Sequence, residues 1–200
     1  MRMATTILGL IGRKQSGKDT FAQRLVEEHG FTRLGFADPL KALAEEMDPI
    51  LFVAELDHEP VRLSHLLSIF TWDEAKERYA EVRQYLQNLG VAVRNNVVEN
   101  AWIQALAERA YATPGPVVVT DCRFPNEAQW ITGLGGETVR IKRPAADSSR
   151  DLHVSETALD AWVTHHVVIN DRGVQELHET ADMLASYIHV PRRFLTSVSV

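Results

Sequence analysis

The sequence contains little cysteine and no long apolar segment. Cys122 is the only cysteine in 200 residues, so no disulfide can form within the chain, and a reducing cytoplasm is the expected compartment. No apolar run approaches the roughly 20 residues that a membrane helix needs. The apolar stretch 7–11 is also too short for a signal peptide. A net charge of −6 disfavours binding to a nucleic-acid polymer. We therefore expect a globular cytoplasmic protein with neither a membrane nor a nucleic acid as partner.

Five short apolar runs rich in β-formers predict the fold class. They lie at residues 5–11, 31–36, 116–120, 138–141 and 166–169, and they are nearly continuous rather than alternating. This pattern is typical of parallel strands that are buried on both faces. Helical stripes separate the runs, for example over 79–89 and 174–188. The sequence predicts one α/β domain over 1–200, a three-layer fold with a five-stranded parallel sheet.

The spacing of the predicted strands is uneven. About eighty residues separate the second run from the third, far more than one crossover needs, and they are mostly helical in pattern. We expect this insertion, at about 38–112, to bind a substrate.

A glycine-rich segment follows the first predicted strand and opens the first predicted helix. It reads Gly12, Arg13, Lys14, Gln15, Ser16, Gly17, Lys18, Asp19, Thr20 and fits the Walker A pattern up to the lysine. In such a loop backbone N–H groups surround phosphate oxygens, the helix N-terminus favours negative charge, and the lysine reaches the β- and γ-phosphates. All nine residues are candidate ATP-binding residues. The pattern wants Ser or Thr directly after the lysine, but Asp19 stands there, so Asp19, Thr20 and a later acid all remain candidates for holding magnesium.

A nucleotide-dependent switch without acceptor turnover would carry the same loop. GTPase switches usually read guanine with an Asn-Lys-x-Asp segment, which this sequence lacks; the segment 170–173 after the last strand has no lysine. A kinase is therefore favoured, and a switch module stays as the alternative.

The helical stripe over 79–89 carries polar residues of another kind. Arg83 and Gln87 are four positions apart and therefore share one face of the helix. A guanidinium suits a phosphate, and an amide suits a base edge. The alternative is an ordinary solvated face.

Five segments in order resemble the phage-type deoxynucleoside monophosphate kinases. They are 12–20, 36–41, 83–90, 121–127 and 153–156, and the likeness runs over about 7–188. Animal phosphomevalonate kinase is more distantly similar. The resemblance implies magnesium-dependent transfer of the γ-phosphoryl group of ATP to a deoxynucleoside monophosphate, in the host cytoplasm if the protein is phage-encoded. A kinase for another phosphomonoester, such as phosphomevalonate, is the alternative, and a homodimer is left open.

The resemblance also implies roles for single residues. Lys18, Arg123 and Arg143 would be catalytic, and Arg143 would also contact ATP from a lid at about 143–156. Thr20 and Asp121 would hold magnesium. The residues expected to contact the acceptor are Lys14, Asp38, Lys41, Arg83, Gln87, Gly90, Trp102, Asp121, Arg123, Glu127, His153 and Glu156. Alternatives remain for several of them, since Asp121 could cap a helix, and Arg123, Arg143 and Arg150 could be surface cations.

Overall fold

The computed structural model describes residues 6–56, 59–147 and 157–188. The chain forms two compact units, one of residues 1–35 with 109–200 and the other of residues 36–108. No helix within the three described stretches combines the length and apolar composition of a bilayer-crossing segment.

The first unit is built on a five-stranded parallel sheet. Its strands are β1 (Ile7–Ile11), β2 (Thr32–Leu34), β5 (Val117–Val119), β6 (Glu137–Lys142) and β7 (His166–Ile169). They lie in the order β2-β5-β1-β6-β7, and every neighbouring pair is parallel. The predicted α/β class and five-stranded parallel sheet are confirmed. The second strand is shorter than predicted, because the chain has already begun its next helix at Ala37.

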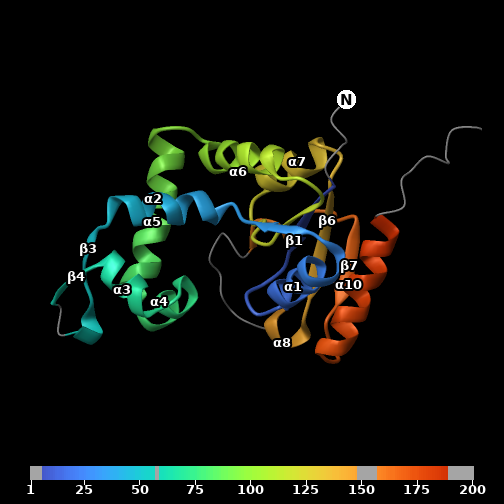
Figure 1. Cartoon of the computed structure of the whole chain (residues 1–200), viewed down its shortest axis with the longest axis horizontal. Coiled ribbons are helices and arrows are strands. Elements are labelled where there is room, and N and C mark those ends of the chain that lie inside the picture. The colour runs from blue at the N-terminus through green and yellow to red at the C-terminus, as the bar shows by residue number, and fades with distance from the viewer. Residues whose placement is uncertain (1–5, 57–58, 148–156, 189–200) are drawn as a thin grey trace, which may run out of the picture. The chain divides into compact units, whose positions relative to one another are not determined.

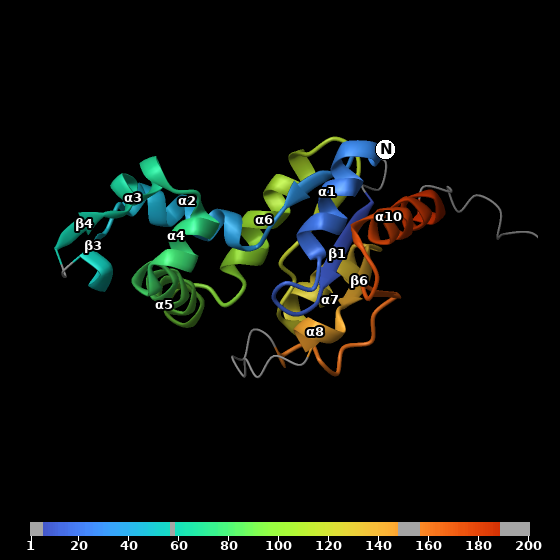
Figure 2. The same ribbon diagram turned by 90° about the horizontal axis from the view of Figure 1, so that it is seen from below.

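Helices cover both faces of this sheet. On one face α1 (Lys18–His29) and α10 (Val174–Ile188) lie side by side (Figure 1). Their buried side chains join those of the strands in one core, which includes Leu10, Phe21, Leu25, Ile141 and Leu177. On the other face α7 (Pro125–Gly133) packs on β1 and β6. Figure 2 shows β1 between α1 and α7, and α8 (Pro144–Asp147) follows β6. The unit is therefore a three-layer sandwich.

An ion-pair cluster fixes α10 to α1. Arg24 of α1 donates two hydrogen bonds to the Asp182 carboxylate, at 2.8 and 2.9 Å, and His29 Nε2 lies 2.8 Å from the same group. These bonds hold the pKa of Asp182 below its usual range, and the Arg24 guanidinium contributes most.

The second unit consists of helices and a short hairpin. Its elements are α2 (Ala37–Met47), β3 (Ile50–Phe52), η1 (Ala54–Leu56), β4 (Pro60–Arg62), α3 (Leu63–Ile69), α4 (Trp72–Arg78) and α5 (Ala80–Asn96). The helix α6 (Ala101–Ala112) begins in this unit and ends in the first. The antiparallel pair β3–β4 was not predicted. Its side chains alternate: Leu51 and Val53 enter the core of this unit, whereas Ile50 and Phe52 are exposed.

The helix α5 also runs further than predicted. It continues through Gly90 and ends at Asn96. A Cβ at Gly90 would lie 3.3 Å from the Leu40 Cδ2 of α2, so the glycine allows a close approach between two helices of this unit. Packing therefore offsets the roughly 1 kcal/mol that glycine costs inside a helix.

Candidate active site

The loop between β1 and α1 has the backbone shape of an anion site. Gly12 and Gly17 both adopt positive φ, at 156° and 103°. An added Cβ would lie 2.4 Å from the Ile141 carbonyl oxygen at Gly12, and 2.5 Å from Asn170 Nδ2 at Gly17. A larger residue would require a shift of the backbone at Gly12 and of the Asn170 side chain at Gly17, where the positive φ also disfavours it. Gly17 is the N-cap of α1, so the loop leads directly to the positive end of that helix dipole.

Lys18, the first residue of α1, lies across the loop. Its ammonium donates hydrogen bonds to the carbonyl oxygens of Gly12, at 2.9 Å, and Arg13, at 2.7 Å. Ser16 is fully buried, and its backbone N–H also donates to the Arg13 carbonyl, at 3.2 Å. Thr20 is partly exposed, and Lys14, Gln15 and Asp19 are exposed. The loop therefore holds the Lys18 ammonium close to several of its own backbone groups.

Segments far along the chain contact the same loop. The Arg13 guanidinium pairs with the Asp160 carboxylate at 2.8 Å. Arg143, which follows β6, lies with its Nη1 atom 3.5 Å from the Gln15 carbonyl oxygen, at the outer limit of a hydrogen bond. Asn170, directly after β7, donates to the Ser16 carbonyl at 2.9 Å.

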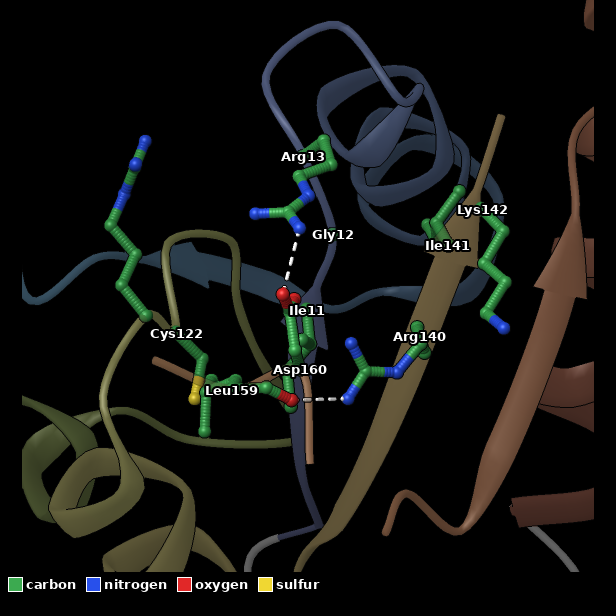
Figure 3. Close-up of a pocket in the computed structure, with 10 residues that line it drawn as sticks. Ile11, Gly12, Arg13, Cys122, Arg140, Ile141, Lys142, Leu159 and Asp160 are labelled. Atoms are coloured by element: carbon green, nitrogen blue, oxygen red, sulfur yellow. Dashed lines mark hydrogen bonds and ion pairs between the residues drawn. The ribbon is translucent and has the colours of Figure 1, made fainter. Parts of the chain in front are cut away.

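A cavity of about 240 Å³ lies beside the loop in the first unit. Its lining comes from the carboxyl ends of β1 and β6, the turn after β5 and the segment 159–160, namely Ile11, Gly12, Arg13, Cys122, Arg123, Arg140, Ile141, Lys142, Leu159 and Asp160. Figure 3 shows the Arg13 side chain pointing at Asp160 and the Arg140 guanidinium pointing at Leu159. Arginine and lysine outnumber acids in this lining, so the cavity attracts anions despite the net negative charge of the chain.

Arg140 fixes one wall of the cavity. Its Nη2 atom donates to the carbonyl oxygens of Leu159, at 2.6 Å, and Trp162, at 2.8 Å. The guanidinium is partly buried and its partners are backbone atoms, so it holds the segment 159–162 against β6. Neither Arg140 nor Asp160 was predicted as a site residue, because both contacts depend on the tertiary fold.

The turn after β5 is held by a buried acid. The Glu127 carboxylate accepts hydrogen bonds from the backbone N–H groups of Arg123, at 2.7 Å, and Phe124, at 3.0 Å. Only 9% of Glu127 is exposed. Burial, with a smaller contribution from the neighbouring Asp121 carboxyl, raises its pKa to about 7 although the two hydrogen bonds lower it. Burial likewise raises the pKa of the Cys122 thiol. Glu127 here caps α7 and shapes the turn that carries Arg123; direct contact with a substrate stays a prediction.

The second unit carries the other predicted acceptor residues. Asp38 and Lys41 are one turn apart on α2 and partly buried. Arg83 and Gln87 are exposed on α5, and Arg83 donates to the Lys76 carbonyl at 3.3 Å. The Trp102 indole N–H donates to the Gly90 carbonyl at 3.2 Å, which links α6 to α5. These six residues thus lie on three helices of one compact unit.

Two predicted acceptor residues, His153 and Glu156, and the lid candidate Arg150 lie outside the described residues. Asp121 lies two residues after the end of β5 and is partly exposed. Within 6–56, 59–147 and 157–188, no three His, Cys, Asp or Glu side chains cluster as a metal site would require. The two predicted magnesium residues, Thr20 and Asp121, therefore need oxygen ligands from phosphate or water to complete a site.

A family model and one curated relative carry the same family description. The family described as deoxynucleotide monophosphate kinase matches residues 45–181, which is more than half of the chain. A protein of Acanthamoeba polyphaga mimivirus, named as a proposed deoxynucleotide monophosphate kinase, is 29% identical over 192 residues, covering 86% of this chain and 92% of its own length. An uncharacterised protein of Ictalurid herpesvirus 1, ORF77, is 35% identical over 95 residues, covering 44% of this chain and 41% of its own.

Among solved structures, TT1252 from Thermus thermophilus aligns with a TM-score of 0.49 and 18% identity, over 92% of this chain and 98% of its own. The family match spans the strands β5, β6 and β7, the turn after β5 and most of the second unit, and the phosphate loop precedes it in the sequence. The chain belongs to the deoxynucleotide monophosphate kinase family.

Proposed function

We propose that the protein transfers the γ-phosphoryl group of ATP to a deoxynucleoside 5′-monophosphate and releases ADP and the diphosphate. One observation carries this proposal beyond family membership: a phosphate loop at the N-terminus of α1 borders a cavity lined by arginine and lysine. Family membership supports a deoxynucleotide over another phosphomonoester such as phosphomevalonate. It also disfavours a switch module without turnover.

On the donor side, the loop binds the phosphates of ATP. The backbone N–H groups of the loop and the first turn of α1 donate to phosphate oxygens. The Lys18 ammonium, which now bonds to two backbone carbonyls, exchanges these partners for the β- and γ-phosphates. Because each phosphate oxygen carries more charge than a carbonyl oxygen, the exchange is favourable. Arg143 adds a second cation beside the loop.

On the acceptor side, the resemblance to the family assigns roles to several residues. Lys14 and Arg123 neutralise the acceptor phosphate and the group in transit. Arg83 binds the acceptor phosphate through its planar guanidinium, whereas Gln87, Gly90 and Trp102 shape the base and sugar site. Asp38 and Lys41 contribute to the same binding region. These assignments rest on the resemblance of the segments 36–41 and 83–90 to the family.

Magnesium fits the oxygen donors that the first unit offers. The Thr20 hydroxyl, in the first turn of α1, and the Asp121 carboxylate, just after β5, are the hard ligands that this ion prefers. When bound, magnesium supplies charge neutralisation at the β- and γ-phosphates. Asp19 is exposed beside Lys18 and is a weaker candidate, because a second carboxylate so close to the phosphates would repel them.

The chemistry requires little from the protein beyond positioning. The acceptor is a phosphate oxygen that is already anionic, so no strong general base is needed. Lys18, Arg123 and Arg143 hold donor and acceptor in line and offset the negative charge that both bring. The lid proposed at 143–156, of which 148–156 lie outside the described residues, would exclude water from the γ-phosphate and so favour transfer over hydrolysis.

A coupled ADP-release assay over a panel of deoxynucleoside and ribonucleoside monophosphates tests the proposal. We expect ADP release that depends on a deoxynucleoside monophosphate and on magnesium. The Lys18→Ala variant should fold normally and lose ~10²-fold or more in kcat, since it removes a preorganised cation from the phosphates. Lys76→Ala is a matched control, because its ammonium pairs with Asp73 at the surface of the second unit. A folded Lys18→Ala protein with normal turnover would contradict the proposal, as would ADP release without any acceptor.

A further inference from the structure

The turn between β7 and α10 contacts the phosphate loop through one side chain. Asn170 is the first residue after β7, and its backbone N–H donates to the Lys142 carbonyl at 2.7 Å. This bond ties the residue to the end of β6. The Asn170 amide then donates from Nδ2 to the Ser16 carbonyl, at 2.9 Å and partly buried. A residue 154 positions away in sequence thus holds one peptide group of the loop.

Because the peptide bond is planar, the bond to the Ser16 carbonyl also orients the Gly17 N–H. The Ser16 carbonyl and the Gly17 N–H belong to one planar trans peptide, so they point in opposite directions. A donor that holds the carbonyl on the side of Asn170 therefore directs the Gly17 N–H away from Asn170. Gly17 needs such a constraint more than other residues, since a glycine rotates freely between conformations.

We propose that Asn170 is a positioning residue for phosphate binding, which acts by fixing the Ser16–Gly17 peptide with its N–H directed into the loop. Asn170 itself does not touch the phosphates. The inference rests on the proposed function for the identity of the ligand, which is the polyphosphate chain of ATP.

Packing around the amide supports a fixed arrangement. A Cβ on Gly17 would lie 2.5 Å from Asn170 Nδ2 and 3.1 Å from Leu177 Cδ2, so the amide and the buried Leu177 side chain together fill the space beside Gly17. The side chain of Asn170, which is partly buried, thereby lies between the loop and the start of α10. We expect the Asn170 amide to keep its hydrogen bond to the Ser16 carbonyl whether or not a ligand is bound.

The other side chains that hold loop carbonyls differ from Asn170 in this respect. Lys18 bonds to the carbonyls of Gly12 and Arg13, but its ammonium must leave them to reach a phosphate. Arg143 lies 3.5 Å from the Gln15 carbonyl, a weak contact, and is itself proposed to bind ATP. Asn170 is neutral, so the phosphates attract it less than they attract Lys18 and Arg143, and it can hold the Ser16 carbonyl during the exchange.

Calorimetric titration of the full chain with ATP and with inorganic tripolyphosphate, both with magnesium, tests the inference. Asn170→Ala should weaken both ligands by the same factor, roughly three- to tenfold, which is the effect of one hydrogen bond. Asn170→Asp keeps the volume but places a carboxylate against the Ser16 carbonyl, so its loss should be larger for both ligands. The KM for the deoxynucleoside monophosphate should not change. The control Gln175→Ala removes an exposed amide that bonds only within α10, to Glu179, and should bind both ligands like the parent protein.

The tripolyphosphate titration separates an effect on phosphate binding from a direct contact between Asn170 and the nucleoside. If Asn170→Ala weakens ATP but leaves tripolyphosphate unchanged, Asn170 contacts the nucleoside directly and the inference is wrong. Unchanged binding of both ligands refutes it as well. Thermal unfolding checks that each variant folds, and if the alanine variant does not, the same two titrations of Asn170→Asp take its place. Failure of the proposed function would give a different result: the parent protein would bind tripolyphosphate but would phosphorylate no monophosphate.

Discussion

Glu127 should make the folded protein less stable as the pH rises, and a Glu127→Gln variant should remove that effect. The carboxyl is buried at the start of α7 and accepts two backbone hydrogen bonds. Burial costs the charged form more than these bonds return, so the pKa in the folded chain is raised to about 7. A glutamine keeps an oxygen acceptor for the same two N–H groups but carries no charge at any pH.

The sign and size of the effect follow from the two pKa values. Below pH 4.5 the group is protonated in both states and contributes nothing to the pH dependence. Between pH 4.5 and about 7 the folded chain holds a proton that the unfolded chain has lost, so the free energy of unfolding falls as the pH rises. The rise of the pKa from 4.5 to about 7 corresponds to about 3 kcal/mol, at about 1.4 kcal/mol for each pKa unit. Well above pH 7 the carboxyl is ionised in both states, and the free energy of unfolding no longer changes with pH on its account.

Urea unfolding at pH 5, 6, 7 and 8, in EDTA to exclude metal ions, measures the effect. The free energy of unfolding of Glu127→Gln should rise relative to that of the parent protein with each step in pH. Most of this difference should be reached by pH 8. Glu27→Gln is a matched control on α1, since Glu27 is exposed and accepts only a surface hydrogen bond from Gln23. Parallel pH profiles for parent and Glu127→Gln, or a variant that loses stability relative to the parent as the pH rises, would refute the reasoning.

Two further substitutions test the cavity wall and the acceptor site. Arg140→Ala removes a cation that holds two backbone carbonyls of the segment 159–162. The free energy of unfolding in urea titrations should therefore fall by about 2 kcal/mol. An unchanged value would show that the segment does not depend on this arginine. Arg83→Ala should raise the KM for the deoxynucleoside monophosphate by roughly 30- to 100-fold, as expected for a lost charge-assisted contact, and leave that for ATP unchanged. A rise for ATP alone would contradict the assignment of Arg83 to the acceptor.

The sequence predicted the sheet well because its signals are local. The runs 5–11 and 116–120 contain β1 and β5, since strands buried on both faces are apolar at nearly every position. The phosphate loop is equally local, because its glycines, its lysine and the flanking elements are adjacent in sequence. Kinase family membership could be predicted from the ordered motifs and is confirmed by the family match.

Features that depend on distant neighbours could not be predicted. The helical stripe was predicted over 79–89, but α5 continues through Gly90, where Leu40 of another helix packs closely. The hairpin β3–β4 was missed because each strand is only three residues long. Asn170 gave no signal beyond its place at the carboxyl end of a strand, where ligand sites gather in α/β sheets. Its partner in the loop is known only from the folded chain.

The strand order has a consequence for synthesis on the ribosome. β1 and β2 are made first, yet they do not pair with each other; β5 lies between them and bonds to both. Residues 36–108 therefore leave the exit tunnel before the strand that joins the first two exists. That unit has a core of its own, made from residues near one another in the sequence, and local contacts form fastest. The nascent chain should thus complete its second unit first, while the first two strands wait as unpaired, aggregation-prone edges for Val117–Val119 to emerge.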